Sequence, residues 1–294
     1  MHKYNDIRDV SELARKVYEY EQMSLVALFE LLKDKYESHG KKATDKLTKA
    51  FELWKHFHAG QKRKSWAPYF THPLIVAILL SDHHPDEDTL VAAMLHDVIE
   101  DTDATKQDLE AFGTDVREMI DGLTKINKDY VDSQKAENDL HVKLETIRKI
   151  LQFGERDMRV IIIKIFDRLH NILTLFWKEN LFSRDRYLRQ TLDIYVPIAK
   201  RVGLRGIYHE FLFHVNYYLR NHRFHQILSE FEKHDEKMVS ITKIITSYAN
   251  KASETQVNSI SFSRRNLFDM QNTEKPNSLP LDRMYFIETV SYTH

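Results

Sequence analysis

One apolar run in the sequence ends in four ionisable side chains. Residues Leu90–Leu95 are all apolar, and His96, Asp97, Glu100 and Asp101 follow them closely. Charges that are buried without partners are very costly, so side chains in such a place must be paired or bind a metal. Residues four apart share one face of a helix, so a continuous helix puts His96 below Glu100 and, equally, Asp97 below Asp101. We therefore expect two metal ligands on one turn and two acid/base carboxylates on the next.

A simpler alternative is a helix whose C-terminal end emerges into solvent and carries its charges with it. A segment that is apolar all round is normally buried, and here it runs directly into doubled carboxylates. This favours the functional interpretation.

A second pattern also emerges from an apolar segment. Asp167, His170, Asn171 and Thr174 follow residues 160–163, and their spacing of i, i+3, i+4 and i+7 forms one continuous stripe on a helix. The alternative is a buried strand over 160–163 followed by a surface helix. This segment alone favours neither.

A third candidate is His72, which follows the basic segment Arg63-Lys64-Ser65. A lone histidine is more often a polar or capping residue than a ligand, and the two cations could be ordinary surface charge. In combination they gain meaning, because neutral imidazole is the commonest protein metal ligand and clustered cations suit phosphate.

Taken together and in this order, these segments resemble the hydrolase domain of the RelA/SpoT-homologue family over roughly residues 45–205. The motifs that carry the resemblance are Gly60-Gln61, Arg63-Lys64-Ser65, Pro68-Tyr69, His72-Pro73, Leu95–Thr102, Asp121–Lys125, Ile163-Lys164, Asp167–Asn171, Ile194-Tyr195 and Pro197–Ala199. Several linked motifs are far more specific than a lone His-Asp pair.

The resemblance implies an all-α HD-domain bundle that hydrolyses the 3′-pyrophosphate of ppGpp or pppGpp to GDP or GTP and pyrophosphate. It implies one Mn²⁺ ion, bound through His72, His96, Asp97 and Asp167, and a mixed nitrogen and oxygen donor set suits this ion. Glu100 and Asp101 match the catalytic carboxylates. The nucleotide-contacting positions are matched by Arg63, Lys64, Ser65, Asn171, Thr174 and Tyr195.

Two departures from the family pattern bear on the substrate. Trp66-Ala67 stands where the family has Gly-Glu, and Ile172-Leu173 stands where it has Met-Arg. Two alternatives to an alarmone hydrolase therefore stay open. One is an HD phosphohydrolase acting on another nucleotide, such as NADPH. The other is a non-catalytic module that binds alarmone or a protein.

The composition excludes several kinds of site and of binding partner. The chain has 294 residues, no cysteine, few glycines and prolines, and a net charge of −1. The absence of cysteine excludes disulfides and thiolate metal sites. Because the net charge is close to zero, the protein has no overall electrostatic field that would attract nucleic acid or an acidic membrane. The charged N-terminus shows no signal peptide and no apolar run is long enough to span a bilayer, so we expect a cytoplasmic protein.

The elements that must position these residues are helices. Periodicity predicts helices within 1–39, over 44–59, from His72, over 88–100, 140–154, 158–176 and 184–201, and two more within 205–250. Polar residues 127–139 predict a loop, residues 251–281 a loop or linker, and the last residues a strand. We assign 1–204 to the hydrolase domain, 205–250 to a helical extension, and 251–294 to a linker and the remnant of a synthetase-like region, partly extended.

Overall fold

The computed structural model describes residues 11–59, 71–133, 139–175, 181–219, 256–264 and 285–293. The chain divides into two compact units, one from Asp6 to Leu204 and one that contains everything from Arg205 onward. In the part of the chain that is described, no helix has the length and apolar character needed to cross a membrane.

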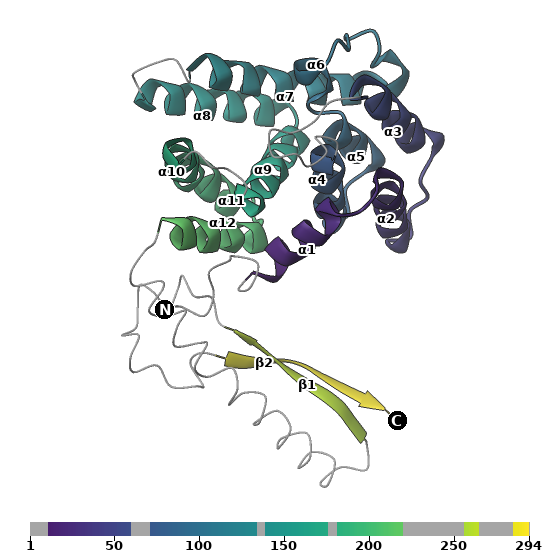
Figure 1. Cartoon of the computed structure of the whole chain (residues 1–294), viewed down its shortest axis with the longest axis vertical. Helices are drawn as coiled ribbons and strands as arrows, with labels where there is room; N and C mark the ends of the chain where they lie inside the picture. The colour runs from purple at the N-terminus through teal and green to yellow at the C-terminus, as the bar shows by residue number, and fades with distance from the viewer. Residues whose placement is uncertain are drawn as a thin grey trace. The chain divides into compact units, whose positions relative to one another are not determined.

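The described residues of the first unit form helices joined by turns, without a strand, as the sequence predicts (Figure 1). Its elements are α1 (Glu12–Glu21), α2 (Leu25–Ser38), α3 (Asp45–Phe57), α4 (His72–Ser81), α5 (Glu87–Met94), α6 (Val98–Asp101), the 3₁₀ turn η3 (Glu110–Phe112), α7 (Thr114–Ser133), α8 (Asp139–Arg156), α9 (Met158–Leu173), α10 (Leu181–Gln190), the π-helical η5 (Thr191–Tyr195) and α11 (Val196–Arg201).

Helix α4 is the centre of this unit. All ten of its residues are buried, and it packs against α1, α2, α5 and α9. It begins at His72-Pro73, where proline is tolerated because the first-turn N–H groups have no partner within the helix. The first residue of α4 is therefore buried among helices that come from distant parts of the sequence.

The predicted helix over 88–100 is interrupted, so this prediction was wrong in one respect. Helix α5 ends at Met94, residues 95–97 form a turn, and α6 starts at Val98. In a continuous helix the carbonyl of Ala93 would accept from the backbone N–H of Asp97. Here that carbonyl lies 2.7 Å from Nδ1 of His96. The side chain takes the place of the helical hydrogen bond, and the helix ends.

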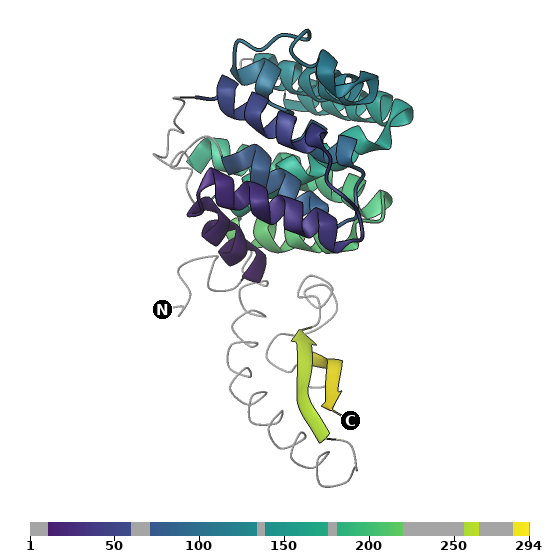
Figure 2. The same ribbon diagram turned by 90° about the vertical axis from the view of Figure 1, so that its right-hand side faces the viewer.

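One segment that was predicted as a loop is partly helical. Residues 127–133 belong to α7, which runs beside α8 in both views (Figures 1 and 2). The rest of the predicted loop lies outside the described residues or, at Asp139, in α8. Residues 160–163, for which a strand was the alternative, lie in α9.

The second unit contains α12 (Arg205–Tyr218) and an antiparallel pair of strands, β1 (Gln256–Arg264) and β2 (Tyr285–Thr293). The prediction of a strand at the end of the chain is confirmed by β2, whereas β1 lies where a loop or linker was expected. The second helix predicted within 205–250 falls outside the described residues.

Candidate metal centre

Three separate segments bring four of the predicted side chains together. His72 is the first residue of α4, His96 and Asp97 occupy the turn between α5 and α6, and Asp167 lies in α9. His96 is fully buried, and His72 and Asp167 are 6% and 8% exposed. Such buried imidazoles and carboxylates need compensating partners.

The nitrogen and oxygen atoms of this cluster face a common point. Nε2 of His72 lies 3.7 Å from Oδ2 of Asp97 and 3.2 Å from Oδ1 of Asp167. Nε2 of His96 lies 2.9 Å from Oδ1 of Asp97 and 4.0 Å from Oδ1 of Asp167. Ligand atoms of His72, His96 and Asp97 all lie within 4.8 Å of one another. This group could hold a metal ion.

The charges in the cluster shift its pKa values in opposite directions. Burial lowers the pKa of His96, but the negative charges of Asp97 and Asp167 outweigh this and raise it to about 9. Burial raises the pKa of Asp97, but the charge of His96 outweighs this and holds it below its ordinary value. Without a metal, a proton on His96 therefore compensates the carboxylates, and a divalent cation can compensate them at the same place.

Asp167 is held from both sides by its own helix. Burial raises the pKa of its carboxyl, but the neighbouring ammonium group of Lys164 outweighs this and keeps it well below the usual range. Asn171 donates from Nδ2 to Oδ1 of Asp167 at 2.7 Å and to its backbone carbonyl at 3.0 Å. The carboxylate is thus ionised and oriented toward His72.

A family model described as the HD domain matches residues 50–205, more than half of the chain. The chain belongs to the HD-domain family.

Three curated relatives have names that refer to GTP or to guanosine pyrophosphates. GTP pyrophosphokinase rsh of Brucella ovis is 42% identical over 168 residues, 56% of this chain and 21% of that protein. The guanosine-3′,5′-bis(diphosphate) 3′-pyrophosphohydrolase of Aquifex aeolicus is 38% identical over 178 residues, 60% of this chain and 24% of that protein. The bifunctional (p)ppGpp synthase/hydrolase SpoT of Escherichia coli is 42% identical over 163 residues, 55% of this chain and 22% of that protein.

The chain therefore spans about a fifth to a quarter of the length of these relatives. A solved structure of a metazoan orthologue of SpoT, described as hydrolysing ppGpp, matches 62% of this chain and 98% of its own. That match has 26% sequence identity and a TM-score of 0.46.

The two predicted catalytic carboxylates closely follow the turn that carries His96 and Asp97. The backbone N–H groups of Glu100 and Asp101 both donate to the carbonyl of Asp97, at 3.0 and 2.9 Å. Glu100 is half-buried and Asp101 is exposed. Both therefore lie one helical turn beyond Asp97, although not on the continuous helix that the sequence predicts.

The predicted nucleotide contacts of the HD domain fall into three groups. Asn171 lies at the metal centre, beside Asp167. Thr174 and Tyr195 are buried, and the hydroxyl of Thr174 donates to the carbonyl of His170 at 2.9 Å. Arg63, Lys64 and Ser65 lie outside the described residues. The nucleotide-binding role of all six stays a prediction.

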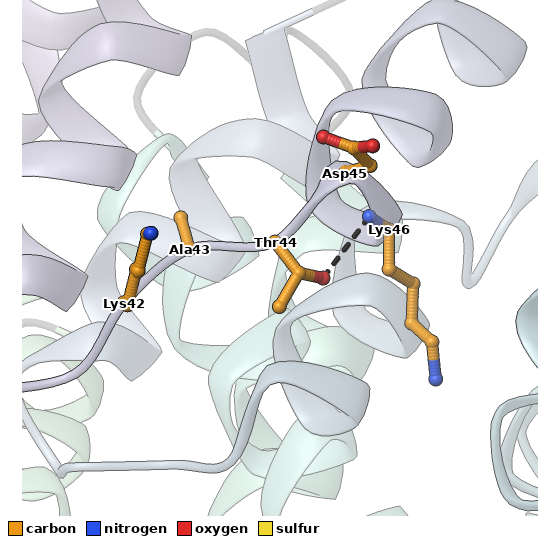
Figure 3. A pocket seen from close by; sticks show the side chains of 5 residues that line it. All are labelled: Lys42, Ala43, Thr44, Asp45 and Lys46. Carbon is orange, nitrogen blue, oxygen red and sulfur yellow. Dashed lines mark hydrogen bonds between the residues drawn. The ribbon is translucent and has the colours of Figure 1, made fainter.

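A surface hollow of about 460 Å³ lies elsewhere, at the start of α3, and is lined by residues 42–46 (Figure 3). Two of its polar side chains, those of Thr44 and Lys46, already make contacts within the fold. The hydroxyl of Thr44 accepts from the backbone N–H of Lys46 at 3.1 Å and donates to Glu87 at 2.8 Å. The ammonium group of Lys46 lies 2.6 Å from Asp88. This hollow is the capped end of a helix and contains none of the metal-centre residues.

Sequence reasoning missed two contributors to the HD-domain centre. Glu21, at the end of α1, lies 3.2 Å from His170, which in turn contacts His72. It comes from a helix with no motif of its own, so the sequence carries no signal for it. Lys164 stands in a motif, and its spacing of three from Asp167 could have predicted their ion pair.

Proposed function

We propose that this HD domain is a metal-dependent pyrophosphohydrolase that removes the 3′-pyrophosphate of ppGpp or pppGpp, giving GDP or GTP and pyrophosphate. The observation that carries the proposal is the convergence of His72, His96, Asp97 and Asp167 on one buried point, with Glu100 and Asp101 one turn away. The relatives named for this activity match the same stretch of chain.

The residues present fit a divalent cation. Two imidazole nitrogens and two carboxylates form a hard, mixed donor set, and both carboxylates are ionised. We propose His72, His96, Asp97 and Asp167 as the ligands and Mn²⁺ as the ion, since this donor set suits Mn²⁺ among several divalent metals. When bound, such an ion polarises a phosphoryl oxygen and lowers the pKa of water.

We assign the remaining roles in the reaction to other residues of the chain. Glu100 and Asp101 lie one turn beyond Asp97, where a carboxylate can orient the attacking water and accept its proton as a general base. Asn171 holds Asp167 in place through its amide. Arg63 and Lys64 supply cations for the nucleotide phosphates, and Ser65, Thr174 and Tyr195 complete the proposed nucleotide contacts.

The deciding experiment is incubation of purified protein with ppGpp and Mn²⁺, with and without a chelator, followed by separation of the nucleotides. We expect GDP and pyrophosphate in equal amounts, and neither when the chelator is present. NADPH is tested in parallel by release of inorganic phosphate. Phosphate from NADPH without pyrophosphate from ppGpp would overturn the proposed substrate but not the metal centre. Protein that binds no Mn²⁺ when the ion is supplied, and that then shows neither activity, would overturn both.

A further inference from the structure

His72 makes a second contact, on the edge of its ring that faces away from the metal centre. Its Nδ1 atom lies 2.8 Å from Nδ1 of His170 in α9. The other ring nitrogen of His170, Nε2, lies 3.2 Å from Oε1 of Glu21 at the end of α1. A chain of contacts thus connects three side chains, from Glu21 through His170 to the proposed metal ligand His72.

These three side chains are enclosed by the helices that carry them. His170 is fully buried, Glu21 and His72 are each 6% exposed, and α1 packs against both α4 and α9. A carboxylate in such a place is costly unless it is paired. The ring of His170 lies between the other two side chains, and its Nε2 is one polar group that faces the Glu21 carboxylate.

The positions of the protons on the two rings follow from the chemistry of imidazole. A neutral imidazole has one N–H donor and one bare acceptor nitrogen. If Nε2 of His72 binds a cation, its proton must be on Nδ1, which donates to Nδ1 of His170. His170 then carries its proton on Nε2, where the negative charge of the Glu21 carboxylate, 3.2 Å away, favours it.

We infer that Glu21 and His170 are positioning residues that fix the metal-binding tautomer and ring orientation of His72. This inference rests on the proposed metal centre, and it adds a residue from outside the motifs of the sequence. Outer partners of this kind orient metal-bound histidines, and their loss typically lowers metal affinity about 10- to 100-fold.

The substitution Glu21→Gln tests the direction of the chain with almost no change in volume. A glutamine amide can donate as well as accept, so it can reverse the chain and leave the proton of His72 on Nε2, where it blocks a cation. We expect the affinity for Mn²⁺ alone, measured by equilibrium dialysis at one fixed pH, to fall about 10- to 100-fold.

Glu210→Gln is the matched control. Oε2 of Glu210 lies 3.3 Å from Nε2 of the buried His214 within α12, so the control removes a similar carboxylate–imidazole pair in the second unit. We expect it to leave Mn²⁺ affinity unchanged. Equal affinities for the wild-type protein and Glu21→Gln would overturn this inference alone. Failure of the wild-type protein to bind Mn²⁺ would overturn the proposed function as well.

Nitrogen-15 spectra of the imidazole rings give a readout that needs no stable Glu21 variant. With Zn²⁺ as a diamagnetic substitute in the wild-type protein, His72 should carry its proton on Nδ1 and His170 on Nε2. A proton on Nδ1 of His170 would overturn the inference, because that nitrogen could then no longer accept from His72.

Discussion

The ammonium nitrogen of Lys164 lies 2.5 Å from Oδ2 of Asp167, one turn further along α9, and both side chains are buried. Burial lowers the pKa of Lys164, but the negative charge of Asp167 outweighs this and raises it above its usual value. The cation therefore stays charged in the interior. It neutralises one carboxylate oxygen and leaves the other, Oδ1, facing His72.

Replacing this buried cation should therefore destabilise the fold. Removing one partner of a buried ion pair leaves the other charge uncompensated, so we expect Lys164→Met to lower the free energy of unfolding of the metal-free protein by about 3 kcal/mol. Urea unfolding measures the change. The control is Lys106→Met, which removes an exposed partner of Asp121 and should cost at most about 1 kcal/mol. Equal effects of both variants would contradict the argument.

Substitution of a proposed ligand should remove the metal without unfolding the helices. We expect Asp97→Ala to lower Mn²⁺ affinity by more than about 100-fold, since loss of an outer partner alone can cost that much. Pyrophosphate release from ppGpp should be lost as well, while the helical circular-dichroism spectrum persists. Full turnover by purified Asp97→Ala protein would falsify the assignment.

Glu100 should affect the reaction without affecting the metal. General acid–base groups typically contribute about 10²- to 10⁴-fold to the rate, so we expect Glu100→Gln to lower kcat by that factor while Mn²⁺ affinity stays unchanged. Glu110→Gln, in the exposed first position of η3, is the control and should behave as the wild-type protein. A normal kcat in Glu100→Gln would assign the proton transfer elsewhere.

Asp157 should make the stability of α9 depend on pH. Its carboxylate caps the helix by accepting from the backbone N–H of Arg159 at 2.9 Å, and it also pairs with the Arg159 guanidinium. Burial raises the pKa of Asp157, but the hydrogen bonds from Arg159 outweigh this and hold it below the ordinary value of 3.8. A lowered carboxyl pKa means that the stabilisation is complete above the unfolded-state pKa and is lost as the pH falls through the folded-state value.

We therefore expect Asp157→Ala to lower the free energy of unfolding by about 1–2 kcal/mol at neutral pH and by clearly less below about pH 4. Urea unfolding at both pH values measures the difference. Asp115→Ala removes a more distant and more exposed carboxylate, 3.4 Å from the same guanidinium, and should change stability little. If the loss of unfolding free energy caused by Asp157→Ala became larger as the pH falls, the prediction would be contradicted.

Gly154 allows α8 and α9 to approach closely. A Cβ atom at this position would lie 2.0 Å from Cδ1 and 2.6 Å from Cγ1 of Ile161. Although alanine favours a helix over glycine by about 1 kcal/mol, we expect overpacking to prevail and Gly154→Ala to destabilise the protein by about 1–2 kcal/mol. Gly206→Ala in α12, where no atom lies within 4 Å of the added Cβ, should be neutral or stabilising. Thermal unfolding of both variants checks the opposite signs.

Most helices could be predicted from the sequence because apolar spacing and end signals act locally. The positions of α3, capped by Thr44, and of α4, with Pro73 in its first turn, agree with that prediction. The interruption at residues 95–97 could not be predicted in this way. It depends on a side chain, His96, which displaces a backbone hydrogen bond of α5, and periodicity does not report such competition.

Segments without a clear apolar pattern were the least predictable. Residues 127–133 continue α7, because extending a helix that is already nucleated adds a hydrogen bond for each residue fixed. Residues 256–264 form β1, whose backbone pairs with β2 about thirty residues later. Neither reason is visible in the composition of the segment itself.

The types and local spacing of the reactive residues, and the helices that carry them, were determined by the sequence. The spacing of residues along one element determines which side chains share a face. It therefore predicted that Asp167 lies beside Asn171 and that Glu100 lies one turn after the His-Asp pair. The meeting of the three segments at one buried point, and the approach of Glu21 behind His72, were decided only by the tertiary structure. Contacts between α1, α4 and α9 depend on how whole helices pack, and helix packing is not a property of any one segment.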